Sequence, residues 1–205
     1  MNLRHSVIVD NFYEQPHALR DLALGLEFIP SPGGIYSGKR TRDLHDTHKF
    51  LYDLVKKRVL KYYDLNPNDF EAEMNFHITE SKFGQEGWVH SDSPIVLASI
   101  LYLNPNINDI SSGTSFFDLK PNFNVDNHIT GKYMRESFKE GKDNLEMKNN
   151  SNSKFIKTAT VGGKFNRLVV YPGTTFHAGE GFFGTGVGDS RLTLLSFFYK
   201  KDQKF

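Results

Sequence analysis

Residues 166–199 read NRLVVYPGTTFHAGEGFFGTGVGDSRLTLLSFFY. The stretch contains three short apolar runs, each bounded by glycine, proline or asparagine, as is typical of β-strands. The same pattern recurs upstream in IVLASILYLN, at 95–104, and in GTSFFDL, at 113–119. Many short strands with turn residues between them predict two sheets packed face to face. The expected fold is a double-stranded β-helix of the jelly-roll, cupin-like type, mainly β with flanking helices.

The segment 71–79 alternates between apolar and polar side chains. A period of two places the members of each set on one face of a strand. The apolar face comprises Ala72, Met74, Phe76 and Ile78, and the opposite face comprises Glu73, Asn75, His77 and Thr79.

The N-terminal part predicts a strand at 5–10 and two helices. The first helix covers 14–26, with Pro16 near its start. The second covers 45–63, because apolar residues recur there three and four positions apart, and Asp46 is a suitable N-cap. Both helices are expected to pack on the outside of the sheet.

The chain of 205 residues is interpreted as one domain, 1–205. Residues 1–65 supply the first strand and the supporting helices, and 71–199 supply the jelly-roll core. The polar stretch at about 120–160 is interpreted as an insertion with at most one weak helix. It is either a solvated surface loop or a lid over the site. Together with the loop 30–42, it is where substrate contacts are expected.

The composition excludes several classes of site and partner. The formal charge is +1 and the pI about 7.9, which makes a nucleic-acid partner unlikely. The absence of cysteine excludes a thiolate metal site and a disulfide framework. No window approaches the ~18 apolar residues needed to span a bilayer, so we expect a cytoplasmic protein without a membrane partner.

His90, Ser91 and Asp92 directly precede an apolar run, and His177 follows far downstream. In an extended segment His90 and Asp92 leave the same side of the chain and can share one metal ion. Two imidazoles and one carboxylate with open positions suit a non-heme Fe(II) enzyme that activates O₂. The alternative is a turn in which Asp92 binds backbone and both histidines are partly buried residues of the core.

Arg191 opens the last apolar strand, and no acidic residue follows it on the same face. A guanidinium buried in this position needs an anionic partner, and its planar fork suits a carboxylate. Thr193 can add a hydroxyl donor to that carboxylate. Trp88, the only tryptophan, is expected in the core or in the wall of a pocket.

These motifs resemble the superfamily of 2-oxoglutarate- and Fe(II)-dependent oxygenases. The similarity is greatest to the prolyl-hydroxylase-like branch and to related proteins that include phage-encoded ones. The matching parts are HSD, ILYLN, SGTSFF, YPGTTFHAGEG and RLT, together with VIVDNFYEQPHALRDLAL and YSGKRTRDL near the N-terminus.

The resemblance implies roles for individual residues. His90, Asp92 and His177 match the iron ligands, and Arg191 matches the residue that binds the distal carboxylate of 2-oxoglutarate. Tyr102 matches a tyrosine that donates to the same carboxylate, or is simply an aromatic residue of its strand. Two further residues either line the cosubstrate pocket or face solvent, namely Asn75 and His77. The branch that demethylates nucleic acids is expected to carry an arginine at position 197, where this chain has Phe197.

The expected activity is hydroxylation of an unactivated C–H bond in a protein side chain or a small amino-acid-like molecule. Fe(II), 2-oxoglutarate and O₂ are the expected cofactors, ascorbate is a possible support, and succinate and CO₂ are the coproducts. The alternatives are a metal-binding cupin-type jelly roll without oxygenase activity and a non-catalytic interaction domain. The sequence determines neither the substrate nor the oligomeric state.

Overall fold

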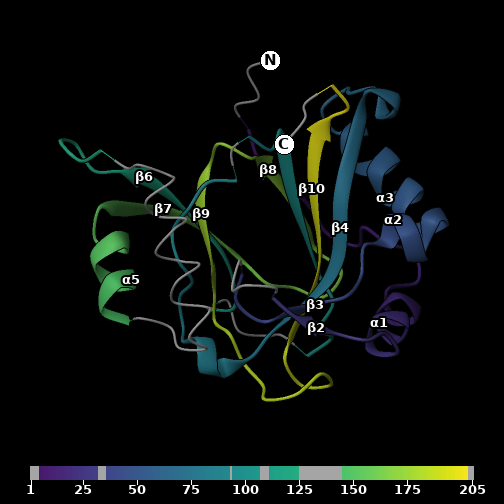
Figure 1. Cartoon of the computed structure of the whole chain (residues 1–205), viewed down its shortest axis with the longest axis horizontal. Helices are drawn as coiled ribbons and strands as arrows, with labels where there is room; N and C mark the ends of the chain where they lie inside the picture. The colour runs from purple at the N-terminus through teal and green to yellow at the C-terminus, as the bar shows by residue number, and fades with distance from the viewer. Residues whose placement is uncertain (1–4, 32–35, 93, 107–110, 125–144, 203–205) are drawn as a thin grey trace.

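Two antiparallel sheets form the frame of the molecule (Figure 1). The computed structural model describes residues 5–31, 36–92, 94–106, 111–124 and 145–202. Within these ranges the larger sheet has seven strands, in the order β1-β8-β5-β10-β4-β3-β2, and the smaller has three, in the order β7-β6-β9. The strands are β1 (Val7–Val9), β2 (Ile29–Pro30), β3 (Lys39–Arg40), β4 (Phe70–Thr79), β5 (Leu97–Tyr102), β6 (Gly113–Leu119), β7 (Phe155–Gly162), β8 (Leu168–Pro172), β9 (Phe176–Glu180) and β10 (Arg191–Lys200). The predicted mainly β, double-sheet architecture is confirmed.

Helices cover the outer face of the larger sheet. Figure 1 shows α1 (Pro16–Leu24), α2 (Leu44–Thr47) and α3 (Lys49–Lys61) together beside β4. The main core lies between these helices and the sheet, and it contains the predicted apolar face of β4: Ala72, Met74, Phe76 and Ile78. Single-turn 3₁₀ helices occupy Pro67–Asp69 and Ser81–Phe83, and α5 (Leu145–Asn152) lies beside the smaller sheet.

The other face of the larger sheet turns toward the smaller sheet and carries both polar side chains and a second, smaller hydrophobic cluster. Directly paired residues of antiparallel strands lie on the same face, so the register defines rows across β4, β10, β5 and β8. From one end to the other, these rows are Thr79 with Arg191; His77 with Thr193 and Tyr102; Asn75 with Leu195, Ile100 and Val169; and Glu73 with Phe197, Ala98 and Tyr171.

The predicted cap of the second helix is wrong. Asp43, not Asp46, caps α2, because its carboxylate accepts a hydrogen bond from the backbone N–H of His45 at 2.8 Å. Its second oxygen accepts a bond from the N–H of Met74 at 3.3 Å, which ties the cap to β4. The non-helical backbone of His48 then separates α2 from α3, so the single predicted helix is in fact two.

The stretch at 120–160 is not wholly an insertion. Residues 155–162 form β7, which pairs along the whole of β6 and belongs to the smaller sheet. The predicted stretch contains one helix within the described residues, α5. Residues 125–144 lie outside the described part of the chain. The choice between a surface loop and a lid falls largely on those residues. Among the described residues, no helix has the length and apolar character required to cross a membrane.

Candidate metal centre

His90 and His177 are held opposite each other by the backbone. The N–H of His90 donates to the carbonyl of His177 at 3.1 Å, and the N–H of His177 donates back to the carbonyl of His90 at 2.9 Å. This is an isolated antiparallel bridge between β9 and the segment that precedes β5. Because paired residues of an antiparallel bridge share a face, the two imidazole rings extend to the same side, with their centroids 4.5 Å apart.

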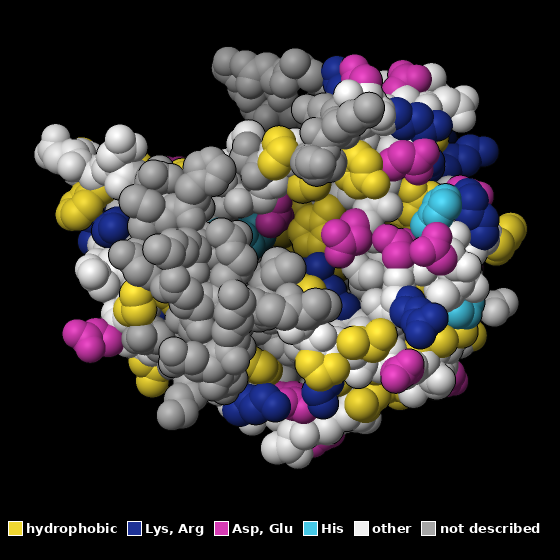
Figure 2. Space-filling model, viewed as in Figure 1, with side chains coloured by type: hydrophobic (Ala, Val, Ile, Leu, Met, Phe, Trp, Pro, Cys, Tyr) yellow, Lys and Arg dark blue, Asp and Glu magenta, His cyan; other side chains and the backbone are white. Residues whose placement is uncertain are grey.

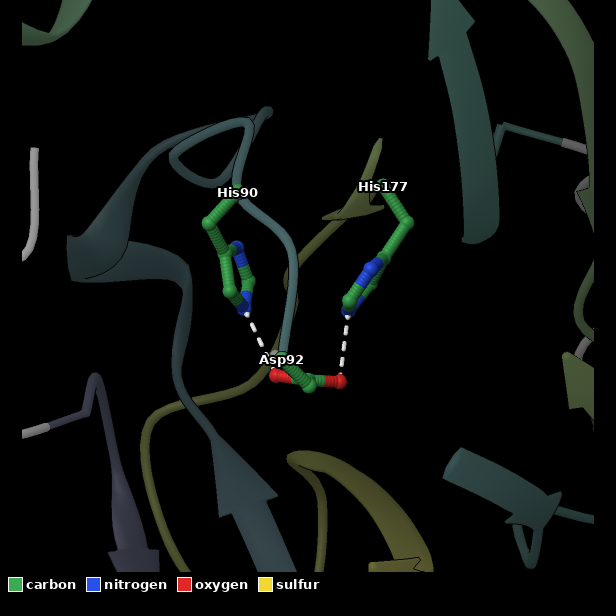
Figure 3. A group of neighbouring side chains, drawn as sticks. All are labelled: His90, Asp92 and His177. Atoms are coloured by element: carbon green, nitrogen blue, oxygen red, sulfur yellow. Dashed lines mark ion pairs between the residues drawn. The ribbon is translucent and has the colours of Figure 1, made fainter. Parts of the chain in front are cut away.

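Asp92 completes the group from the same segment as His90. Its backbone N–H donates to the carbonyl of Gly173 at 2.7 Å, which fixes the chain just beyond β8. Figure 3 shows both rings directed at Asp92, one toward each carboxylate oxygen, with Nε2 to oxygen distances of 3.5 Å in both cases. One potential ligand atom from each residue lies within 4.8 Å of the others.

Backbone carbonyls assign the tautomer of each histidine. Nδ1 of His90 lies 2.8 Å from the carbonyl oxygen of Trp88, and Nδ1 of His177 lies 3.0 Å from that of Thr175. A carbonyl only accepts hydrogen bonds, so each Nδ1 carries the proton. Each neutral ring therefore presents the lone pair of Nε2 to the space beside Asp92, as a metal ligand requires.

The protonation states favour a divalent cation. Burial lowers the pKa of His177 to about 4, so its imidazole is neutral at physiological pH. Burial also opposes charge on Asp92, but the neighbouring His177 and His90 hold the pKa of that carboxyl below its usual value. Burial opposes charge on His90 as well, and here the Asp92 carboxylate prevails and raises the pKa. A metal ion would displace the His90 proton.

The three residues fit an ion of the Fe(II) class. Oδ2 of Asp92 is buried and has no hydrogen-bond partner, so it lacks the stabilisation that a buried carboxylate oxygen normally receives. Ligands at about 2.0–2.2 Å from a metal and at right angles to one another lie about 3 Å apart. Each imidazole nitrogen lies 3.5 Å from an Asp92 oxygen, so a small inward movement of the side chains would bring them to that spacing. Two histidines and one carboxylate, with the remaining positions open toward a cavity, form the facial set of non-heme iron oxygenases.

His90, Asp92 and His177, here called the metal group, lie in the wall of a cavity of about 350 Å³ between the two sheets. Figure 2 shows a hollow near the middle of this face, where hydrophobic, acidic and basic side chains meet. The wall also contains Arg191, His77, Tyr171, Ile100, Leu195 and Trp88. Trp88 is buried and lines this cavity, as expected. The larger share of the wall is apolar, which limits water near the ion.

Arg191 is a buried cation whose donors are largely unused. It is 4% exposed, its Nη2 donates to the carbonyl of Gly113 at 3.1 Å, and its Nε is buried without a partner. Its guanidinium lies 5.3 Å from the ring of Tyr102 and 5.7 Å from that of Phe182. No carboxylate of the described residues forms an ion pair with it. A buried cation of this kind is suited to an anionic ligand in the cavity.

The other predicted cosubstrate residues lie behind the wall. Tyr102 is buried, and its hydroxyl is 2.7 Å from that of Thr114. Thr193 is buried in the same row, with its hydroxyl 3.5 Å from the carbonyl of His77. Asn75 donates to the carbonyl of Thr41 at 3.2 Å and is not part of the cavity wall. The solvent-facing alternative for Asn75 is wrong, since the residue is buried, and cosubstrate binding by all three stays a prediction.

His77 does line the cavity. Its Nε2 donates to the carbonyl of Ser37 at 2.6 Å, and burial lowers its pKa to about 3, so the ring is neutral. This bond fastens the loop before β3 over β4.

Arg40 and Tyr36 also belong to the wall and were not singled out from the sequence. Arg40 sits within the loop 30–42, for which substrate contacts were expected. Arg40 lies between Lys39 and Arg42 in a polar stretch, and no local pattern distinguishes it from them, because only the pairing of β3 with β4 brings it to the cavity.

Solved structures with the same fold come from 2-oxoglutarate oxygenases. HygX from Streptomyces hygroscopicus, with nickel and 2-oxoglutarate bound, matches with a TM-score of 0.60 at 14% identity, over 96% of this chain and 83% of that chain. The non-heme α-ketoglutarate-dependent carbocyclase SnoK from nogalamycin biosynthesis gives 0.58 at 12% identity, over 96% and 80%. A prolyl hydroxylase from Trichoplax adhaerens, in complex with a peptide of hypoxia inducible factor, gives 0.52 at 14%, over 96% and 84%. The jelly-roll fold is thereby confirmed.

Sequence comparison identifies a family but no activity. No curated protein matches this chain. A family profile described as a family of unknown function covers residues 2–198. That range includes both sheets, the metal group and Arg191. The chain therefore belongs to the family of unknown function DUF6445.

Proposed function

We propose that this protein is an Fe(II)- and 2-oxoglutarate-dependent dioxygenase that hydroxylates an unactivated C–H bond of a small amino-acid-like molecule or a protein side chain. One observation carries the proposal: a His–Asp–His group and a buried arginine that has no acidic partner among the described residues share a single cavity. When bound, Fe(II) with 2-oxoglutarate and O₂ supplies the oxidant, and succinate and CO₂ are released.

The protein's contribution is to hold the metal ion, to orient 2-oxoglutarate and to exclude water. His90, Asp92 and His177 hold the ion on one side and leave its other positions open to the cavity. Arg191 binds the distal carboxylate of 2-oxoglutarate through its unused donors. Ile100 and Leu195 lie in the wall and keep water from the reacting atoms.

The fold neighbours support this proposal by analogy only. HygX binds 2-oxoglutarate and SnoK is α-ketoglutarate-dependent, and both have low sequence identity to this chain. Because one fold hosts many reactions, the chemistry of the site bears more weight than the fold. The competing interpretation is a metal-binding jelly roll without oxygenase activity.

The test is succinate formation from 2-oxoglutarate in air, with added Fe(II) and with ascorbate to keep the iron reduced. We expect turnover by the native protein and none by His90→Ala. The matched control is His45→Ala, which removes an exposed histidine paired with Asp46. If the native protein binds Fe(II) but Fe(II)-dependent binding of 2-oxoglutarate is absent, the competing interpretation is correct.

A further inference from the structure

A second arginine, Arg40, reaches the cavity from a different strand. β3 pairs Arg40 with His77 on the edge of β4, which turns its side chain onto the cavity face. The guanidinium lies 3.9 Å from the ring centroid of Tyr36 and 5.3 Å from that of Phe197. Contacts with two rings hold the group in place while leaving its edges free for hydrogen bonds.

The hydrogen-bonding capacity of Arg40 is mostly unused. Its side chain is 14% exposed, and its one hydrogen bond to a described residue runs from Nη1 to Glu73 at 3.2 Å. Nε is buried without a partner. Burial lowers the pKa of Arg40, which reflects how little the surroundings compensate its charge. The side chain of Glu73 is half exposed, so water weakens this ion pair.

Arg40 and Arg191 serve different parts of the cavity. The guanidinium of Arg191 lies 5.3 Å from the ring of Tyr102, in the row of His77, whereas that of Arg40 contacts Glu73 and Phe197, two rows further along the sheet. Arg191 contacts Gly113, Tyr102 and Phe182, none of which contacts Arg40. One molecule of 2-oxoglutarate bound to the ion therefore does not need both arginines.

The metal group lies nearer to the guanidinium of Arg40. Tyr171 shares the row of Phe197 and Glu73, and its ring is 4.6 Å from that of His177. The charge of Asp92 also acts on Arg40, which places the two groups within electrostatic reach. A molecule anchored on Arg40 is thus within electrostatic reach of the candidate metal residues and held by a different arginine from the one proposed for 2-oxoglutarate.

We propose that Arg40 binds the carboxylate of the substrate that is oxidised, and that this substrate is a small monocarboxylic acid. The inference rests on the proposed function and names its substrate class. A planar carboxylate can accept two parallel hydrogen bonds from a guanidinium. A single negative charge is favoured over a dianionic phosphate because the carboxylates of Glu73 and Asp92 both act on Arg40 and would repel a second charge.

The size of the cavity supports a small substrate. Ligand pockets typically measure about 300–1,000 Å³, and the 350 Å³ here must hold 2-oxoglutarate as well. The body of the acid would lie against Phe197, Tyr36 and Ile95, which are all part of the wall.

The test uses the full chain loaded with Ni(II) and 2-oxoglutarate, which prevents turnover, and follows thermal unfolding with added ligands. The probes are the free L-amino acids and simple aliphatic and aromatic monocarboxylic acids, each compared with its carboxamide and, where one exists, with the analogous phosphate ester. We expect at least one acid to stabilise the protein and its amide and phosphate analogues not to. Arg40→Gln should weaken binding of that acid at least about 30-fold.

Two further variants separate recognition from structure. Arg58→Gln is the matched control, since Arg58 pairs with Glu14 on the surface away from the cavity. Arg40→Lys keeps the charge but loses the planar fork, so it should retain a weakened preference for acid over amide. If Arg40 only fastens its loop to β4, both Arg40 variants will lower stability and leave the acid-to-amide ratio unchanged, which would overturn the proposal.

The same titrations distinguish two kinds of failure. If the native Ni(II)-loaded protein does not bind 2-oxoglutarate, the proposed function itself is wrong. If it binds 2-oxoglutarate but no acid in preference to its amide, or prefers the phosphate esters, only the assignment of Arg40 is wrong.

Discussion

Replacing Arg191 with methionine should move stability and cosubstrate binding in opposite directions. Arg191 is buried, has no acidic partner among the described residues and leaves Nε without a hydrogen bond. Replacing poorly compensated buried charge with apolar side chains of similar volume is neutral or stabilising by about 1–4 kcal/mol. The lost bond to Gly113 costs about 1 kcal/mol. We therefore expect the free energy of unfolding of the metal-free variant to lie between about 1 kcal/mol below and about 3 kcal/mol above the native value.

The effect on 2-oxoglutarate should be large and adverse. Removing one partner of a buried, hydrogen-bonded charge pair costs about 2–5 kcal/mol. With tenfold in affinity for each ~1.4 kcal/mol, Kd should rise between about 30-fold and several thousand-fold. Titration of the Ni(II)-loaded protein with 2-oxoglutarate measures this change. Thermal unfolding of the metal-free protein measures stability, at about 2–4 °C per kcal/mol for a chain of this size.

Arg167→Met is the matched control. Arg167 forms two hydrogen bonds with the carboxylate of Asp10, at 2.6 and 3.1 Å, so the same substitution there should lower Tm and leave 2-oxoglutarate binding unchanged. The reasoning is refuted if Arg191→Met lowers Tm more than Arg167→Met does, or if its affinity for 2-oxoglutarate stays within about threefold of the native value.

Three further predictions concern the metal, acid stability and the core. Ni(II) at about 100 times its Kd should raise Tm by about 5–10 °C in the native protein and not in His177→Ala; an equal rise in the variant would exclude His177 as a ligand. Burial lowers the pKa of His77 from 6.5 to about 3, so as pH falls below 6.5 the unfolded chain binds a proton that the folded protein does not. Urea titrations should show native stability falling by about 2 kcal/mol more than that of His77→Gln between about pH 7.5 and 5, and parallel curves would contradict this. The hydroxyl of Tyr52 accepts from the N–H of Ala72 and donates to Glu71, both at 2.9 Å, so Tyr52→Phe should cost about 1–3 kcal/mol in the same titration, whereas a loss below ~0.5 kcal/mol would argue against it.

The elements with strong local patterns were predictable. β4 alternates strictly, and its apolar face meets the helices as expected. β6 has the predicted bounds, 113–119, because turn residues bound a short apolar run. In contrast, β7 reads FIKTATVG and exposes most of its side chains at the edge of the smaller sheet. A polar edge strand lacks the burial pattern on which sequence reasoning depends, so β7 was included in the insertion.

The candidate site was predictable where its residues adjoin such strands. His90, Asp92, His177 and Arg191 were singled out because each lies beside or within an apolar run, and the structure brings all four to one cavity. Arg40 enters that cavity only through long-range pairing of β3 with β4, which no local pattern reveals. The break between α2 and α3 was missed because the helical spacing of apolar residues continues across it. The earlier cap, Asp43, is favoured by a long-range hydrogen bond that its carboxylate accepts from the N–H of Met74.

The two histidines of the candidate metal centre are oriented by main-chain oxygens, at Nδ1 of each ring. In both cases the acceptor belongs to the residue two positions earlier, Trp88 for His90 and Thr175 for His177. A substitution at either position changes a side chain but keeps the carbonyl. The orientation of the two imidazoles therefore does not depend on which side chains form the surrounding walls of the cavity. This independence makes the scaffold a good starting point for engineered selectivity, since libraries aimed at the walls leave the orientation of the imidazoles intact.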